Sequence, residues 1–371
     1  MSEIKVMIVD DSAVVRKHLG DLLTGAGLTV LGSASDPIFA MQRMKQNWPD
    51  VIVLDVEMPR MDGISFLKQI MAERPTPVVM CSTLTEKGGQ TTMQALAAGA
   101  VGFVTKPKLG LKAFLEDDGN GIVAAVKAAA KANLSALRRT IAGSAPMKPG
   151  APRPVTHVLP PVTHTGAEAM VETTDRVIAI GISTGGVQSI EAVLTRLPRT
   201  VPGMVIVQHM PPNFTASLAA RLNTLCALEV MEAKDGDRVI NGRVLFAPGG
   251  KHMRLKRSGA QYVAEVFDGP VVNHHRPCVD VLFKSVAQCA GANAIGLVMT
   301  GMGDDGARGL KDMRAAGALT AAQDEASSVV YGMPKEALRQ GGAQDVVSLD
   351  DIPGWLLRAA QRRVGLSSAN S

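Results

Sequence analysis

Residues 176–186 (RVIAIGISTGG) place a serine where it could act as a nucleophile. Their apolar run, residues 177–182, is typical of a buried strand, and Ser183 follows it at a glycine-rich turn that opens a helix-like segment, residues 187–197. On such a turn the helix-start N–H groups could stabilise an oxyanion beside the serine, or could bind a phosphate. A third interpretation is that Ser183 or Thr184 only caps the helix.

Two further residue types that acyl transfer needs follow other apolar runs. His209 follows MVIVQ, and Asp304 and Asp305 follow AIGLVMTG in the loop TGMGDDG. Because the carboxyl ends of parallel strands share one edge of a sheet, a hydroxyl, an imidazole and a carboxylate are expected to meet there. The imidazole would take the serine proton, and the carboxylate would fix the imidazole tautomer. Residue type and position do not separate Asp304 from Asp305.

Other histidines could supply the base. His252 follows the next strand through APGG, and His274 and His275 precede RPCVDVLF. Adjacent histidines suggest a metal, but neighbours on an extended chain point in opposite directions, and no Cys/His/Asp spacing completes a ligand set. Position at a strand end favours His209 over His252. The alternative for His209 is a partly buried histidine held by the Met-Pro-Pro turn.

A second group of polar residues follows the strands expected in the first 110 residues. Five apolar runs (KVMIVD, TVLGSA, VIVLDV, VVMCS and GFVTKP) alternate with helical segments, which predicts a doubly wound (βα)5 sheet. The polar residues at the strand ends are Asp10, Asp11, Asp55, Ser82 and Lys106. Three converging carboxylates favour a hard cation such as Mg²⁺, and the hydroxyl and ammonium would suit a phosphoryl group on one carboxylate. Helix capping would explain one or two of these residues only.

Residues 4–125 closely resemble the receiver domain of two-component response regulators. The resemblance rests on DD, VLDVEMPRMDG, the Ser82 position and TKP. It implies that a histidine kinase phosphorylates Asp55 and that Phe103 is the aromatic switch residue. It also implies a Mg²⁺ site made by Asp10, Asp11, Asp55 and the backbone carbonyl of Glu57, with Ser82 and Lys106 contacting the phosphoryl group.

Composition and charge divide the chain into three parts. We predict a receiver domain at 1–126, a helix tail and basic, Pro-rich linker at 127–173, and a catalytic domain at 174–371. The net charge is +5, and residues 127–167 hold six Lys/Arg and no Asp/Glu. Because this segment has no aromatic residue for base stacking and no helix-turn-helix pattern, we expect no nucleic-acid partner.

The C-terminal part returns to α/β patterning. Apolar runs alternate with helical segments over residues 174–350, and HMRLKRS and QYVAEVFDG alternate with period two, as in a hairpin. The predicted fold is a mostly parallel α/β sheet with an antiparallel hairpin. The four cysteines form no C-x-x-C pair and no apolar run has membrane-spanning length, so we expect a cytoplasmic protein with no direct membrane insertion.

This part of the chain looks like the catalytic domain of the chemotaxis protein-glutamate methylesterases. The motifs are GISTGG, VQHMPPNFT, APGGKHMRL, HHRPCVDVLFKS, TGMGDDGARG and QDEASSVVYGMPKEA. Position by position, the resemblance implies Ser183 as nucleophile, His209 as base and Asp305 as orienting acid. It also implies the backbone N–H of Met302 as an oxyanion donor and Thr184 as a nearby polar support. Cys278 stands where the family more often has serine, which puts a hydroxyl hydrogen bond there in doubt.

Both resemblances together imply a phosphorylation-regulated serine hydrolase of chemotaxis adaptation. It would demethylate glutamate methyl esters and deamidate glutamine on methyl-accepting chemoreceptors, with no metal at the esterase site and a chemotaxis histidine kinase as phosphodonor. We hypothesise that the unphosphorylated receiver covers the Ser183 edge and that phosphorylation weakens this contact. The alternatives are a response regulator whose second domain only binds a nucleotide or protein, and a regulator that acts through DNA.

Overall fold

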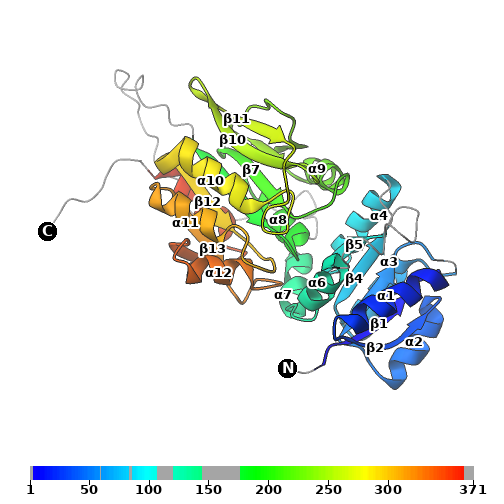
Figure 1. Ribbon diagram of the computed structural model, residues 1–371. Helices are drawn as coiled ribbons and strands as arrows, with labels where there is room; N and C mark the ends of the chain where they lie inside the picture. The colour runs from blue at the N-terminus through cyan, green and yellow to red at the C-terminus, as the bar shows by residue number, and fades with distance from the viewer. Residues whose placement is uncertain (1–2, 59, 83–85, 107–119, 144–175, 363–371) are drawn as a thin grey trace, which may run out of the picture.

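The computed structural model describes residues 3–58, 60–82, 86–106, 120–143 and 176–362 (Figure 1). They form two α/β units, and the first contains a five-stranded sheet in the order β2-β1-β3-β4-β5 with every neighbouring pair parallel. Its strands are β1 (Lys5–Val9), β2 (Thr29–Ala34), β3 (Val51–Asp55), β4 (Val78–Ser82) and β5 (Gly102–Thr105). Its helices are α1 (Ala13–Gly25), α2 (Pro37–Gln46), α3 (Gly63–Glu73), α4 (Glu86–Ala97) and α6 (Asn120–Ala129). The predicted (βα)5 unit is confirmed.

The second unit is built on a seven-stranded parallel sheet in the order β14-β13-β12-β6-β7-β9-β8. These strands are β6 (Val177–Ile182), β7 (Gly203–Gln208), β8 (Glu229–Glu232), β9 (Arg243–Phe246), β12 (Ala294–Val298), β13 (Leu319–Gln323) and β14 (Asp345–Val347). The predicted antiparallel hairpin is also confirmed. It joins β10 (His252–Ser258) to β11 (Gln261–Phe267) as a separate two-stranded sheet.

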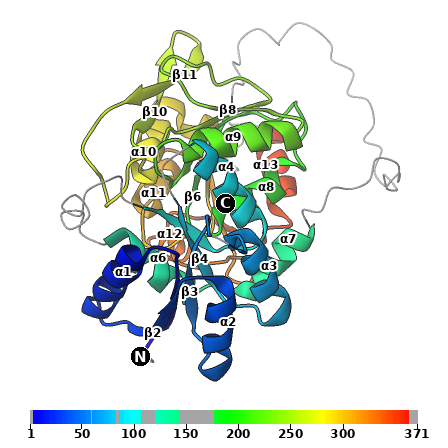
Figure 2. The ribbon, with the colours of Figure 1, turned by 90° about the vertical axis from the view of Figure 1, so that its right-hand side faces the viewer.

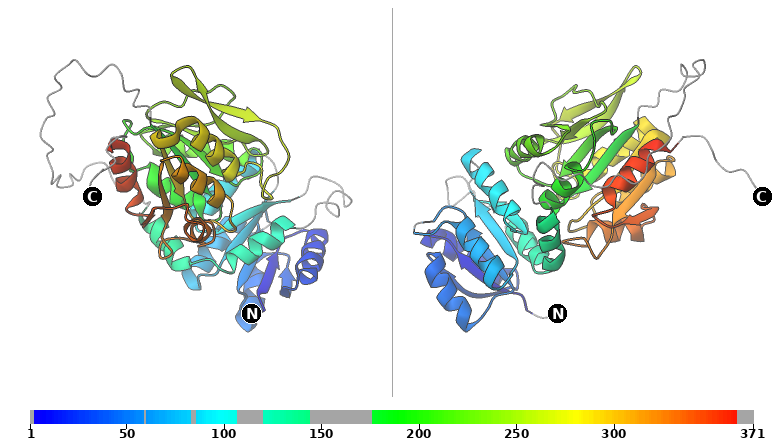
Figure 3. Two further views of the ribbon diagram at one scale, coloured as in Figure 1. Left: turned by 60° about the vertical axis from the view of Figure 1, so that its left-hand side comes forward. Right: turned by 180° about the vertical axis from the view of Figure 1, so that it is seen from behind.

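Helices cover both faces of the large sheet, because the side chains of its strands alternate between two apolar cores (Figure 3). Along β6, Ile178 and Ile180 pack in one core and Val177 and Ala179 in the other. The first core includes α8 (Gly186–Leu194), α9 (Phe214–Leu225) and α13 (Ile352–Gln361). The second includes α10 (Val279–Ala290), α11 (Ala307–Ala315) and α12 (Met333–Arg339), and a 3₁₀ turn (Gly291–Asn293) follows α10.

Two helices join the first unit to the second. The domain boundary predicted at residue 126 falls inside α6, and α7 (Leu134–Gly143) follows it. The N–H of Asn133, just before α7, donates to the carbonyl of Val329 in the second unit (2.8 Å). Val329 and Val330 share an apolar cluster with Val126 and Leu137. The part of the predicted linker from 144 onward lies outside the described residues.

The two units also pack directly against each other. The helix α4 lies beside α8 and α9 (Figure 2). The side chain of Gln188 in α8 donates to the carbonyl oxygens of Leu96 (2.5 Å) and Ala100 (3.0 Å) in the first unit. The Phe103 ring of β5 lies 4.5 Å from the Phe214 ring of α9. Over the described residues, no helix combines the length and apolar character needed to span a bilayer.

Candidate active site

Ser183 lies at the carboxyl end of β6, in the turn that leads into α8. Its N–H donates to the carbonyl of Thr300 (3.0 Å), and its carbonyl accepts from the N–H of Gly186 (2.8 Å). The helix cap is Gly185, which makes no side-chain hydrogen bond, so neither Ser183 nor Thr184 caps α8. Gly185 has a left-handed φ of 76°, and a Cβ there would lie 2.4 Å from Cβ of Val329. The turn therefore requires glycine and leaves the Ser183 hydroxyl unused as a cap.

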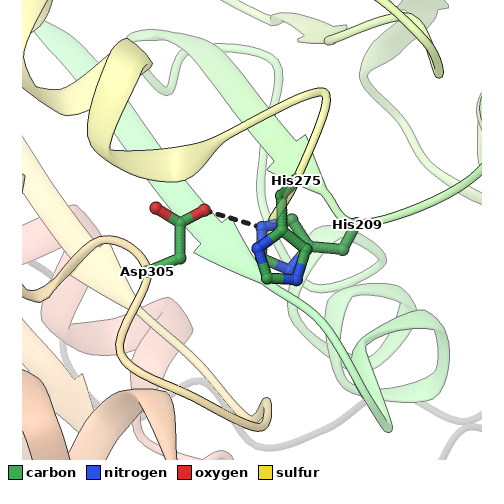
Figure 4. Close-up of side chains that lie close together, drawn as sticks. All are labelled: His209, His275 and Asp305. Carbon is green, nitrogen blue, oxygen red and sulfur yellow. Dashed lines mark hydrogen bonds and ion pairs between the residues drawn. The ribbon is translucent and has the colours of Figure 1, made fainter. Parts of the chain in front are cut away.

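His209 directly follows β7, the strand paired with β6. Its N–H donates to the carbonyl of Ile182 (3.1 Å), which brings His209 to the sheet edge where Ser183 lies. Its Nε2 lies 2.8 Å from Oδ2 of Asp305, and Figure 4 shows the imidazole facing that carboxylate. Nδ1 of His209 is buried and has no hydrogen-bond partner among the described residues. With Nε2–H donated to the carboxylate, Nδ1 carries the lone pair that a general base needs.

Asp305 is surrounded by hydrogen-bond donors at the N-terminus of α10. Its Oδ1 accepts from the Asn273 amide (2.9 Å), the Cys278 thiol (3.0 Å) and the Asp280 N–H (3.1 Å). Its Oδ2 accepts from the N–H of Val279 (2.7 Å). Burial raises the pKa of the Cys278 thiol, which keeps it protonated and able to donate. The hydrogen bond that the sequence put in doubt is therefore made by sulfur.

These donors keep Asp305 ionised although it is only 1% exposed. Burial alone would raise the pKa of Asp305, but the hydrogen bond and charge of His209, with the bonds from Cys278 and Asn273, hold it well below its usual range. Asp304, the neighbour that the sequence could not distinguish, is exposed. Of the two, only Asp305 contacts the imidazole.

Sequence reasoning missed two residues that hold Asp305 in place. Asp280 is 2% exposed and accepts the N–H groups of Gly306 (3.1 Å) and Gly309 (2.7 Å), which fixes the loop carrying Asp305. Asn273 donates to both carboxylates, since its amide also lies 2.9 Å from Oδ2 of Asp280. The sequence feature that could have indicated this positioning role is the place of Asp280, an acidic residue in the first turn of α10.

The other histidines take different places. His252, the rival base, is 1% exposed and contacts the carbonyl of Pro270 through Nε2 (2.8 Å). His275 stacks on His209 with ring centroids 3.7 Å apart and planes 7° from parallel. Ligand atoms of His209, His275 and Asp305 lie within 4.8 Å of one another. The lone pairs of stacked rings lie in two nearly parallel planes, however, so the two imidazoles do not converge on one ion as a zinc site requires.

Thr184 lies in the Ser183 turn, and Met302 lies in the loop that follows β12. The N–H of Met302 has no acceptor among the described residues, so it is available to an oxyanion. The carbonyl of Thr184 accepts from the Thr300 hydroxyl (2.9 Å), which ties the turn to the strand-end loop that carries Met302. Met302 and Ser183 thus belong to two loops that are joined by a hydrogen bond.

Gly301 is expected to be essential for this arrangement. A Cβ at Gly301 would lie 2.8 Å from Cβ of Ser183 and 2.3 Å from Sδ of Met333, so Gly301→Ala must displace the serine turn. A misplacement of about 1 Å lowers rates roughly 100-fold, and we expect a loss of that size in the kcat of a reaction that uses Ser183. The control is Gly20→Ala in α1, where a Cβ meets nothing within 4 Å. Equal kcat values for the two variants would contradict the prediction.

The first unit gathers its carboxylates at the edge where its strands end. The Lys106 ammonium lies 2.8 Å from Asp10 and 2.7 Å from Asp55, and oxygens of Asp10, Asp11 and Asp55 lie within 4.8 Å of one another. Burial raises the pKa of Asp55 to about 6, although Lys106 opposes this rise. A cavity of about 220 Å³ opens over the cluster, lined by Asp11, Asp55, Val56, Glu57, Ser82 and Lys106. Asp11 and Asp55 line this cavity and Asp10 lies close to both, so the three carboxylates are a donor set that fits Mg²⁺.

The remaining residues predicted for this cluster lie beside it. The N–H of Lys106 donates to the carbonyl of Ser82 (2.6 Å), and the N–H of Glu57 donates to Oδ1 of Asp55 (3.3 Å). Phe103 lies within β5, the strand that Lys106 directly follows, and its ring contacts Phe214, five residues after His209. Phe103, which belongs to the receiver-like unit, therefore contacts α9, the helix that follows His209 in the second unit.

Family models match both units of the chain. Residues 178–356 match the CheB methylesterase family, and residues 6–116 match the response regulator receiver domain. Together the two matches include both clusters of polar residues described above.

Curated relatives match almost the full length of the chain. A protein-glutamate methylesterase/protein-glutamine glutaminase 2 of Shewanella denitrificans is 59% identical over 95% of this chain and 99% of its own length. One of the same name from Albidiferax ferrireducens is 60% identical over 93% and 97%. Among solved structures, the Thermotoga maritima CheB methylesterase catalytic domain is 36% identical, covers 49% of this chain and 97% of its own, and gives a TM-score of 0.48.

Proposed function

The chain belongs to the protein-glutamate methylesterase/protein-glutamine glutaminase family, and from this premise we propose that Ser183, His209 and Asp305 are its catalytic triad. The protein is a phosphorylation-regulated hydrolase of chemotaxis that demethylates glutamate methyl esters and deamidates glutamine. The single observation that supports the triad most strongly is the 2.8 Å contact between His209 and the buried Asp305. It lies at the sheet edge where Ser183 follows β6. This membership favours catalysis over a second domain that only binds.

In the proposed first step, Nδ1 of His209 takes the proton of the Ser183 hydroxyl. The oxygen attacks the side-chain carbonyl of a methylated glutamate, and the developing oxyanion accepts the N–H of Met302. The protonated imidazole then gives its proton to the leaving methoxide, so methanol departs and a glutamyl–serine ester remains. Asp305 stabilises the imidazolium that exists between the two transfers. Glutamine reacts in the same way with ammonia as the leaving group.

In the second step, His209 removes a proton from water, which attacks the glutamyl–serine ester. The ester breaks, the proton returns to the Ser183 oxygen and free glutamate leaves. A general base contributes about 10²–10⁴ in rate, and an oxyanion donor contributes roughly 10²–10³. We propose Thr184 as a support of the turn through its carbonyl, which accepts from Thr300.

The receiver domain takes a phosphoryl group in a Mg²⁺-dependent reaction. We propose Asp55 as the acceptor, with Mg²⁺ held by Asp10, Asp11, Asp55 and the carbonyl of Glu57. The ion would offset the negative charge of the carboxylates and of the incoming phosphoryl group. We propose that Lys106 and Ser82 then contact the phosphoryl oxygens. The proposed phosphodonor is a chemotaxis histidine kinase, and the proposed substrates are chemoreceptor helices in the cytoplasm.

We propose that the receiver restricts access to Ser183 until it is phosphorylated. Two contacts support this: Phe103 packs on Phe214, and Met302 packs against the apolar cluster that joins Val329 to receiver side chains. A phosphoryl group adds roughly −1.5 to −2 charge beside Lys106, which directly follows β5, the strand that contains Phe103. Each 1.4 kcal/mol lost from this contact would raise the open population about tenfold while closed molecules predominate.

Removing Mg²⁺ is expected to abolish activation and leave the basal activity intact. Without the ion, the carboxylates around Asp55 repel the incoming phosphoryl group, whereas the Ser183 site uses no group that a chelator removes. The measurement is methanol release with acetyl phosphate, before and after EDTA treatment. Restoration by added Mg²⁺ is the control. Loss of the basal rate in EDTA would contradict the prediction.

Methanol release from methylated receptor tests the proposed activity. Wild-type protein is compared with Ser183→Ala, with and without a phosphodonor. We expect Ser183→Ala to release no methanol above background in either condition. Ser258→Ala, an exposed serine of the hairpin, is the matched control and is expected to behave as wild type. Persistent methanol release by Ser183→Ala would overturn the proposed nucleophile.

A further inference from the structure

The ring of His275 covers one face of His209. The two imidazoles are nearly parallel, 7° apart in plane and 3.7 Å apart at their centroids, and Figure 4 shows them superposed beside Asp305. We propose that His275 is a positioning residue that holds the His209 ring toward Asp305 and stabilises its protonated form by face-to-face stacking. This inference rests on the function proposed above and adds to it a residue outside the triad.

The backbone around His275 is fixed by the same contacts that fix Asp305. Val272 and His275 exchange two N–H···O=C bonds (3.1 and 2.9 Å), which closes a tight turn. Inside this turn Asn273 and His274 have left-handed φ values of 50° and 62°. Asn273 anchors the turn to Asp305 through its amide (2.9 Å). The orientation of the His275 ring is thus coupled to the position of the carboxylate that His209 contacts.

Burial keeps the stacked ring neutral. The pKa of His275 is lowered to about 4, and burial is the largest cause. The His209 ring lowers this pKa further, whereas the charge of Asp305 raises it. Charged or titratable groups on the elements around the pair include His274 on the same turn, Cys278 and Asp280 at the start of α10, and Arg308 on α11, which contacts Asp280 and Asn273. Near pH 7 the His275 ring therefore presents an uncharged aromatic face to His209.

An uncharged aromatic face attracts a cation more strongly than it attracts a neutral ring. The charge on His209 exists only while it holds the serine proton, so the attraction acts in the reaction and not in the resting enzyme. Stacking of this kind is worth roughly three- to thirtyfold in rate. A ring with no nitrogen can supply it, because the ring face makes the contact, and the hydrogen bond of His275 with the Asn273 backbone takes no part in this attraction.

The test compares two substitutions in the full-length, phosphodonor-activated enzyme. His275→Phe keeps a flat ring, and His275→Leu removes it. We expect His275→Leu to lower kcat about tenfold with little change in KM, and to move the acidic limb of the pH profile of kcat/KM to lower pH. We expect His275→Phe to restore most of both. A merely structural role would lower Tm without moving the acidic limb.

Each remaining outcome decides against the proposal. If His275→Leu keeps the wild-type kcat and pH profile, the stacking has no role. If His275→Phe is as impaired as His275→Leu, a ring nitrogen acts directly. Should His275→Leu fail to fold, His275→Gln takes its place, since it also lacks the ring. His209→Gln is measured in parallel: if it remains active the triad itself is wrong, whereas its inactivity beside a fully active His275→Leu rejects the stacking alone.

Discussion

Replacing Asp305 with asparagine is expected to lower kcat about 10⁴-fold. Oδ1 of Asp305 receives three donors, from Asn273, Cys278 and the N–H of Asp280, so the carbonyl oxygen of the new amide should occupy that position. Its NH₂ group must then face His209. The imidazole would have to accept at Nε2 and carry its proton on Nδ1, the atom that must take the proton of Ser183.

The matched control for this variant is Asp304→Asn. The two residues are adjacent, but Asp304 is exposed, so the same chemical change there should leave kcat within about twofold. Methanol release and the thermal midpoint are measured for both variants. A large loss of activity in Asp304→Asn, or near-normal activity in a folded Asp305→Asn, would show that the acid has been assigned to the wrong residue.

Replacing His209 with glutamine is expected to lower kcat by roughly 10⁴- to 10⁶-fold, because the variant lacks both the base and the acid of the two steps. The effect should appear in kcat, since KM reports the binding of the receptor helix. Single-turnover experiments with methylated receptor should find no acyl-enzyme.

His252→Gln serves as the control for this prediction. His252 is the rival histidine that the sequence offered, and its Nε2 contacts only the carbonyl of Pro270 among the described hydrogen bonds. A glutamine amide can make the same bond, so we expect kcat close to wild type. If His252→Gln were inactive and His209→Gln active, the base would be the rival histidine.

Strand ends explain why so much of the site could be predicted from sequence. A buried apolar run predicts a strand, and parallel strands bring their carboxyl ends to one edge of the sheet. The sequence therefore predicts that Ser183, His209 and the Asp304–Asp305 pair lie at the same edge. Burial of a single residue in a loop follows from tertiary packing, and for that reason residue type and position alone did not separate Asp305 from Asp304, which only the family resemblance distinguished. The pattern of the hairpin likewise predicted its pairing, but not that it forms a separate sheet.

The contacts of Asn273, His275 and Asp280 could not be predicted from the sequence. The opposite directions expected for His274 and His275 assume an extended chain, whereas Asn273 and His274 have left-handed backbone and His275 stacks on His209. Non-glycine residues adopt that conformation rarely, so no local pattern predicts it. Asp280 acts through N–H groups of another helix, which is a long-range contact.

Fluorophosphonate labelling tests the central claim most directly, because such a probe reacts with a serine only where a base activates it beside an oxyanion site. The phosphodonor-treated protein is labelled, digested and mapped by mass spectrometry, alongside His209→Ala. We predict one adduct, on Ser183, in the wild-type protein and none in His209→Ala. An adduct on another residue, or labelling of Ser183 that persists without His209, would contradict the account.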